Sequence, residues 1–198
     1  MMALGSSCHD PKGATKANFK SAIQTALDKR PSCLSIALPA EPRGMLDGRP
    51  KADPQLDAPV AAGLATKNLV MMQNSGWTLN GGPKQIQGTH YDFSAEGRKY
   101  AAHPEHSGLM INTATLCYGT PEVIEIVRYS EPGNLMGQTM TNVVYNTALK
   151  SVPSWAKDKE LSDQFPELRK LPTQDHPQES HIDLVLMNDG WRVASSLF

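Results

Sequence analysis

The segment of residues 117–149 most constrains how this chain folds, because its pattern predicts two long β-strands joined by a turn. Residues 122–130 are rich in Val, Ile and Tyr, which suit a pleated, half-buried surface. Strand alternation places Ile126 on one face and Val123 on the other, so both faces are partly apolar. We therefore expect a central strand that the rest of the chain covers on both sides.

A turn and a return strand complete this predicted hairpin. Residues 131–134 read Glu-Pro-Gly-Asn, in which Pro restricts φ and Gly and Asn tolerate positive φ, so the chain is expected to turn there. Residues 138–149 predict the return strand. The connection is longer than a two-residue hairpin turn, and Gly137 is placed to supply a bulge.

Chain length, composition and net charge limit the kinds of protein that this chain can be. The chain has 198 residues, enough to bury a core as one domain or as two small ones. Its 15 Gly and 15 Pro indicate many loops and turns. The formal net charge is -1, so we expect no nucleic-acid partner. No apolar run reaches the roughly 18 residues that a transmembrane helix needs.

The first half predicts a helix and a small hairpin module. Phe19, Ile23 and Leu27 repeat at helical spacing within a predicted helix over residues 14–30. Residues 68–79 and 84–93 predict two strands around an Asn-Gly-Gly-Pro turn.

The segment of residues 91–100 has a pattern similar to one found in winged-helix modules. Such modules carry an aromatic-x-Leu-Thr-x-x-Gly-Arg pattern at the second wing strand, and here Phe93 and Ser94 stand where Leu and Thr are usual. The resemblance implies a winged-helix-like shape. The near-neutral charge and the lack of a basic recognition helix argue against DNA binding.

The second half predicts strands with one inserted helix. Residues 109–116, 181–187 and 191–197 predict strands, and residues 153–168 predict the helix. The expected fold class is α+β: an N-terminal helix plus a winged-helix-like module, followed by a mostly antiparallel β-sheet with an inserted helix. The expected domain ranges are a disordered tail at 1–13, a helical and winged-helix-like part at 14–108, and an antiparallel β part at 109–198.

Three cysteines bear on the cellular compartment. Cys8 follows Leu-Gly-Ser-Ser, which resembles the end of a bacterial lipoprotein signal with the apolar residue one position too far away; the alternative is an incidental Cys in a polar tail. Cys33 and Cys117 remain as a pair, which in an oxidising compartment indicates a disulfide worth about 4 kcal/mol. In the cytosol they would be two free thiols.

Short motifs along the chain point to a group of proteins. They are ATKANF at 14–19, CL at 33–34, FSAEGRKY at 93–100, CYG at 117–119, VY at 144–145, PSWA at 153–156, FP at 165–166 and DGW at 189–191. In this order they are similar to uncharacterised bacterial envelope lipoproteins. The resemblance implies a signal peptide, a lipidated Cys8 and a pairing of Cys33 with Cys117. It implies no activity.

Histidines are the richest source of possible metal ligands. His103 and His106 lie in one cluster, and His176 and His181 lie in another. Both clusters contain Pro, so neither forms the helical H-E-x-x-H arrangement, and solvated surface histidines are the other interpretation. There is also no G-x-S-x-G nucleophile motif.

These observations predict a non-enzymatic protein of the bacterial cell envelope. We expect a periplasmic binding or adaptor module without a cofactor, attached to the membrane through a lipid on Cys8, with an unknown protein or small ligand as its partner. The alternative is a metal-binding protein or metal-dependent hydrolase that uses the loop histidines.

Overall fold

The computed structural model describes residues 10–38, 40–44, 53–73, 85–102, 114–135 and 137–194. The chain divides into two compact units, each built from separate stretches of sequence. Unit 1 comprises Met1–Pro31, Thr120–Lys150 and Leu171–Phe198, and unit 2 comprises Ser32–Gly119 and Ser151–Lys170. The domain ranges expected from the sequence, 14–108 and 109–198, stay predictions. Most of the expected tail at 1–13 lies outside the described residues.

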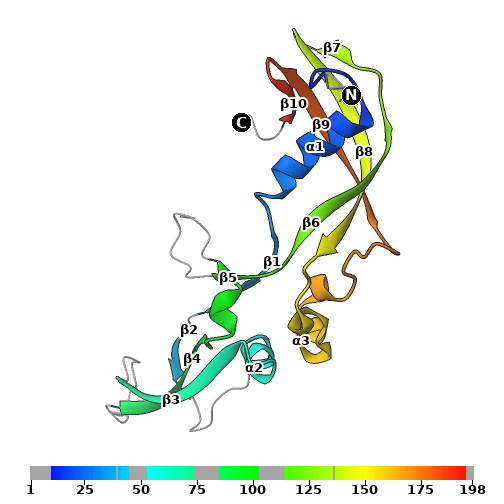
Figure 1. Ribbon diagram of the computed structural model, residues 1–198. Helices are drawn as coiled ribbons and strands as arrows, with labels where there is room; N and C mark the ends of the chain where they lie inside the picture. The colour runs from blue at the N-terminus through cyan, green and yellow to red at the C-terminus, as the bar shows by residue number, and fades with distance from the viewer. Residues whose placement is uncertain are drawn as a thin grey trace, which may run out of the picture. The chain divides into compact units, whose positions relative to one another are not determined.

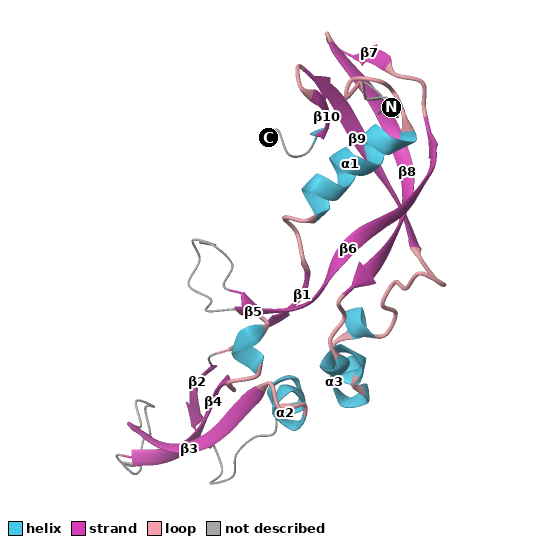
Figure 2. Cartoon of the chain, viewed as in Figure 1, coloured by secondary structure: helices cyan, strands magenta, loops and turns pink. Residues whose placement is uncertain are grey.

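The fold is mostly antiparallel β, so the predicted class with a winged-helix module is wrong (Figures 1 and 2). The predicted strand pair exists as β3 (Ala65–Gln73) and β4 (Gln85–Phe93), but β2 (Ala40–Gly44) pairs with β4 to give a three-stranded sheet in the order β2-β4-β3. After β4 the chain forms a single 3-10 turn, Gly97–Lys99. The α-helices of the described residues have only 12, 8 and 6 residues.

Helix α1 (Lys16–Leu27) belongs to unit 1. Thr15 caps its first turn, because its hydroxyl oxygen accepts the backbone N–H of Asn18. The helix ends at Leu27 instead of the predicted Arg30. Lys29 therefore lies beyond the last turn, on the segment that leads out of the helix.

Antiparallel strands form the sheet of unit 1, in the order β6-β8-β9-β10 with β7 beside β8. The strands are β6 (Ala114–Tyr129), β7 (Gly133–Leu135), β8 (Gln138–Lys150), β9 (Gln178–Met187) and β10 (Gly190–Val193). The predicted long hairpin is β6 and β8, but its tight turn falls later, because Leu135 already pairs with Gln138. Gly137 lies in that turn with φ 82°, so it supplies a turn and not a bulge.

The irregularities of this hairpin lie inside β6. The register against β8 shifts between Val123 and Glu125 and again between Ile126 and Arg128. A bulge resets the alternation of a strand. Val123 and Ile126 are therefore both buried in one core, although simple alternation predicts opposite faces.

The core of unit 1 lies between α1 and the sheet (Figure 1). Phe19 packs edge-on against Tyr129 and Trp191, with ring centroids 4.9 Å and 5.1 Å apart. Gln24 ties the helix to β6, since its Nε2 donates to the carbonyl oxygen of Pro121 and its Oε1 accepts the N–H of Val123. The buried members of this core are Phe19, Ile23, Val123, Ile126, Val143, Tyr145, Leu184, Trp191 and Val193.

Unit 2 contains the predicted disulfide. Strand β1 (Ser32–Ile36) pairs with the first part of β6, and in this register Cys33 lies directly opposite Cys117. Their Cα atoms are 3.8 Å apart and a disulfide joins them, which confirms the pairing. On the same stretch of β6, the short strand β5 (Ala101–Ala102) pairs with Leu116 and Thr115.

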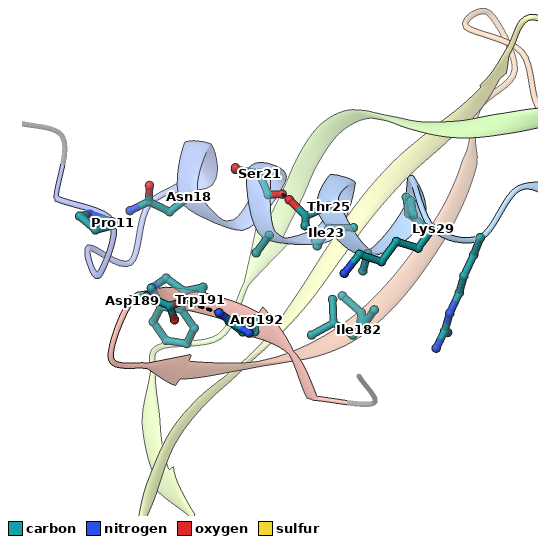
Figure 3. A pocket seen from close by; sticks show the side chains of 16 residues that line it. Pro11, Asn18, Ser21, Ile23, Thr25, Lys29, Ile182, Asp189, Trp191 and Arg192 are labelled. Carbon is teal, nitrogen blue, oxygen red and sulfur yellow. Dashed lines mark hydrogen bonds and ion pairs between the residues drawn. The ribbon is translucent and has the colours of Figure 1, made fainter. Parts of the chain in front are cut away.

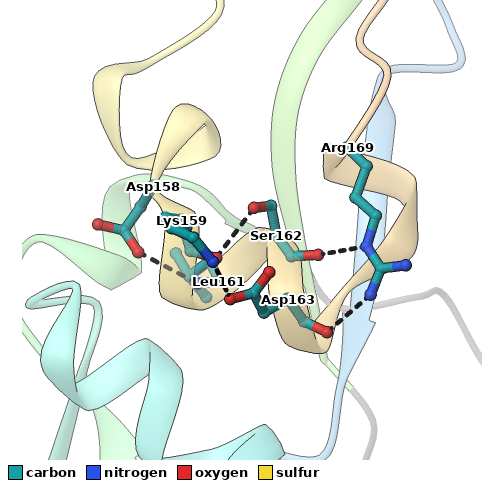
Figure 4. A network of polar contacts seen from close by, with 6 residues as sticks. All are labelled: Asp158, Lys159, Leu161, Ser162, Asp163 and Arg169. Carbon is teal, nitrogen blue, oxygen red and sulfur yellow. Dashed lines mark hydrogen bonds and ion pairs between the residues drawn. The ribbon is translucent and has the colours of Figure 1, made fainter.

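The predicted inserted helix is broken into three pieces. A 3-10 turn (Ser154–Lys157) precedes α3 (Lys159–Gln164), and a second 3-10 turn (Pro166–Leu168) follows it. Pro166 has no N–H to continue the helix. Arg169 covers the end of α3, where its guanidinium donates to the carbonyl oxygens of Ser162 and Asp163 at 2.9 Å each (Figure 4).

Candidate binding groove

A groove in unit 1 is a candidate binding site among the described residues. It runs between α1 on one side and β9 and β10 on the other, and has a volume of about 540 Å³ (Figure 3). Sites that hold small ligands span roughly 300 to 1,000 Å³. A second hollow near Ile36 and Phe165 in unit 2 has only about 70 Å³.

Small side chains on α1 keep the groove open. Ala22 and Ala26 are four residues apart, so they lie on the same face of the helix. Both line the groove, as do Leu27 and Ile182. All four pack against the core but stay partly exposed, so the groove wall presents apolar surface that is not covered by the described chain.

Buried core residues also line the groove. Ile23, Trp191 and Val193 line the groove and are almost fully buried. The indole Nε1 of Trp191 already donates to the carbonyl oxygens of Lys12 and Gly13, at 3.1 Å and 3.2 Å. Trp191 therefore offers the groove its ring atoms, while its N–H group is occupied.

The charges along the groove are mostly positive. Lys29 and Arg30 line it and are exposed, and their side chains have no hydrogen bond or ion pair with the described residues. Figure 3 shows the Lys29 side chain pointing into the groove toward Ile182. Arg192 and Asp189 form an ion pair at the hairpin end, and the hydrogen bond from Arg192 lowers the pKa of Asp189.

A second polar cluster lies in unit 2 and ties α2 (Pro54–Ala61) to β3 and β4. Asp57 Oδ1 accepts both the Lys67 ammonium at 2.7 Å and the Tyr91 hydroxyl at 2.9 Å. Burial raises the pKa of Asp57, but these two hydrogen bonds and the charge of Lys67 lower it by more together. All three groups are satisfied by one another, so the cluster is explained by structure alone.

The structure describes only some of the residues that the sequence predicts as sites. Cys8, His103 and His106 lie outside the described residues. His176 is exposed in the loop before β9, and His181 is exposed on β9 opposite Val144. Within the described part of the chain, no group of three or more His, Cys, Asp or Glu side chains is placed to hold a metal ion. The Cys33–Cys117 pair forms the expected disulfide.

Comparison of the chain with protein-family models, with curated proteins and with solved structures finds no match. Among the described residues, no helix has the length and apolar character needed to cross a membrane.

Proposed function

We propose that this chain is a non-enzymatic binding or adaptor protein of the bacterial cell envelope, and that it binds its partner in the groove of unit 1. The single observation that supports this most is the groove itself. Its wall combines incompletely buried apolar side chains with cations that have no described partner. An apolar wall with a few polar groups is typical of ligand sites.

The disulfide supports the compartment. Cys33 and Cys117 are joined, and such bonds persist in oxidising compartments such as the bacterial periplasm. The likeness to envelope lipoproteins adds a lipid on Cys8 to the proposal. The protein would then be held at the membrane surface by its N-terminus, with the groove free in the periplasm.

Filling the groove tests the binding proposal. Ala26→Trp places a large ring where a small side chain lines the groove, and Ala17→Trp places the same ring at an exposed position of α1 that does not line it. Ligand binding raises the melting temperature of a native protein. We expect compounds that stabilise the wild-type protein to stabilise Ala17→Trp equally and Ala26→Trp much less. Equal stabilisation of both variants would contradict the proposal.

Cell fractionation tests the location. We expect the protein expressed in its own host to sediment with membranes, and Cys8→Ser to move it to the soluble periplasmic fraction. Recovery of the wild-type protein from the cytosol would contradict the envelope location. Recovery of both forms with the membranes would contradict a role for the lipid.

A further inference from the structure

We infer that the occupant of the groove is a medium-chain fatty acid, with its hydrocarbon chain along α1 and its carboxylate beside Lys29 and Arg30. This inference rests on the proposed function and names the ligand class for the same site. It follows from the apolar side chains of α1 and β9 and the two adjacent cations, Lys29 and Arg30, that line the same groove.

The apolar part of the groove suits a hydrocarbon chain. Ala22 and Ala26 line the groove from α1, and Ile182 lines it from β9. These side chains offer no hydrogen-bonding group. The indole N–H of Trp191, which also lines the groove, is taken up by two backbone carbonyl oxygens. The Thr25 hydroxyl, which also lines the groove, donates to the carbonyl oxygen of Ser21. Against Ala22, Ala26 and Ile182 a polar ligand group would stay unpaired, whereas a methylene group loses nothing.

The charged part suits one anionic group. Lys29 and Arg30 follow each other directly after α1, and their side chains have no hydrogen bond or ion pair with the described residues. Two features oppose an anion there: the negative end of the α1 dipole and the carboxylate of Asp28 at the C-cap. Asp28 accepts a hydrogen bond from Gln24 and does not line the groove. Asp189, the carboxylate that does line the groove, forms an ion pair with Arg192. The cations therefore prevail at this end.

Titration calorimetry with the full chain tests the inference directly. The probes are dodecanoate, decanoate, acetate and the cationic dodecyltrimethylammonium, each below its micelle concentration. We expect dodecanoate to bind at one site, with affinity falling about threefold to fourfold for each methylene removed. Acetate should show no binding. The cation should bind at least about tenfold more weakly than dodecanoate, because it meets like charges.

Charge variants locate the carboxylate. Lys29→Gln with Arg30→Gln should weaken dodecanoate binding roughly fivefold to tenfold, the range for two exposed ion pairs. The matched control is Lys150→Gln with Lys170→Gln, two exposed lysines that do not line the groove. It should bind dodecanoate like the wild-type protein. Equal weakening in both double variants would overturn the placement of the carboxylate.

The experiments distinguish a wrong ligand class from a wrong binding site. If dodecanoate does not bind, while other compounds stabilise the wild-type protein and not Ala26→Trp, the ligand class is wrong and the binding groove stands. If dodecanoate binds the wild-type protein and a correctly folded Ala26→Trp variant with equal affinity, the groove is not the site and both proposals are wrong. Dodecyltrimethylammonium binding as tightly as dodecanoate would overturn the role of the cations.

Discussion

Cys33 and Cys117 occupy directly opposed positions on β1 and β6, and the disulfide between them joins residues 84 positions apart in the sequence. The loop that it closes contains β2, β3, β4 and α2, which carry much of unit 2. A cross-link of this length restricts the unfolded chain far more than the folded one.

Removing this disulfide should destabilise the protein strongly. We expect Cys33→Ser with Cys117→Ser to lower the free energy of unfolding by about 4 kcal/mol. Urea denaturation followed by circular dichroism measures the change. Reduction of the wild-type protein should reproduce it, and Cys8→Ser should not. An unfolding midpoint that is the same with and without reductant would contradict this prediction.

Gly97 should not tolerate a methyl group. A Cβ at this position would lie 1.9 Å from the carbonyl oxygen of Leu64, which itself accepts the N–H of Ser94. We expect Gly97→Ala to cost about 3 kcal/mol of stability, because the backbone must move apart. Gly133→Ala is the matched control, since nothing lies within 4 Å of its Cβ, and it should change stability by less than about 0.5 kcal/mol. Equal melting temperatures of the two variants would disprove the close contact.

Asp57 should make the free energy of unfolding depend on pH in the acidic range. Its pKa is lowered in the folded protein, so its contribution is fully present above the unfolded pKa and is lost as the pH falls through the folded value. We expect Asp57→Asn to be less stable than the wild type at pH 7, and the difference to shrink as the pH falls below the unfolded pKa of 3.8. Denaturation at a series of pH values measures this convergence. Asp175→Asn, at an exposed position without a described contact, should run parallel to the wild type.

Gln24 should hold α1 against the sheet. Gln24→Ala leaves the N–H of Val123 and the carbonyl oxygen of Pro121 without this partner. We expect a loss of about 1 to 3 kcal/mol and faster hydrogen exchange of the Val123 amide. Ser21→Ala, at an exposed position of the same helix, should leave that exchange rate unchanged. Unchanged exchange in Gln24→Ala would show that the contact contributes nothing.

Local patterns predicted many elements but not their partners. The β-branched run at residues 122–130 and the alternation at 181–187 identified β6 and β9 correctly, since strand periodicity is a local property. Residues 41–53, rich in Pro and Gly, predict a loop, yet Ala40–Gly44 is a strand. Pro42 is tolerated there because β2 lies at the edge of its sheet and its register is irregular between Ala40 and Arg43.

The winged-helix assignment failed because sequence order does not determine which elements pack together. The helix with Phe19 and Ile23 packs on β6, β8, β9 and β10, far along the chain, and belongs to a different unit from the β3–β4 hairpin that follows it in sequence. Only pairing across the whole chain specifies that arrangement, and it is not visible in a local pattern.

The groove was missed for a related reason. The helical period already placed Ala26 and Leu27 on the apolar face of α1, which reads as core. Whether such a face is covered depends on the strands that lie opposite, and Ile182 and Trp191 come from the other end of the chain. The small size of Ala22 and Ala26 was the available signal that this face is not filled completely.

The most direct test of the binding groove is an NMR titration of the isotopically labelled full chain with dodecanoate. The account predicts amide shift changes that concentrate at Ala22, Ala26 and Lys29 on one side and at Gly190 and Trp191 on the other, with none at Phe93 in unit 2. Changes centred on unit 2, or spread evenly over both units, would contradict it.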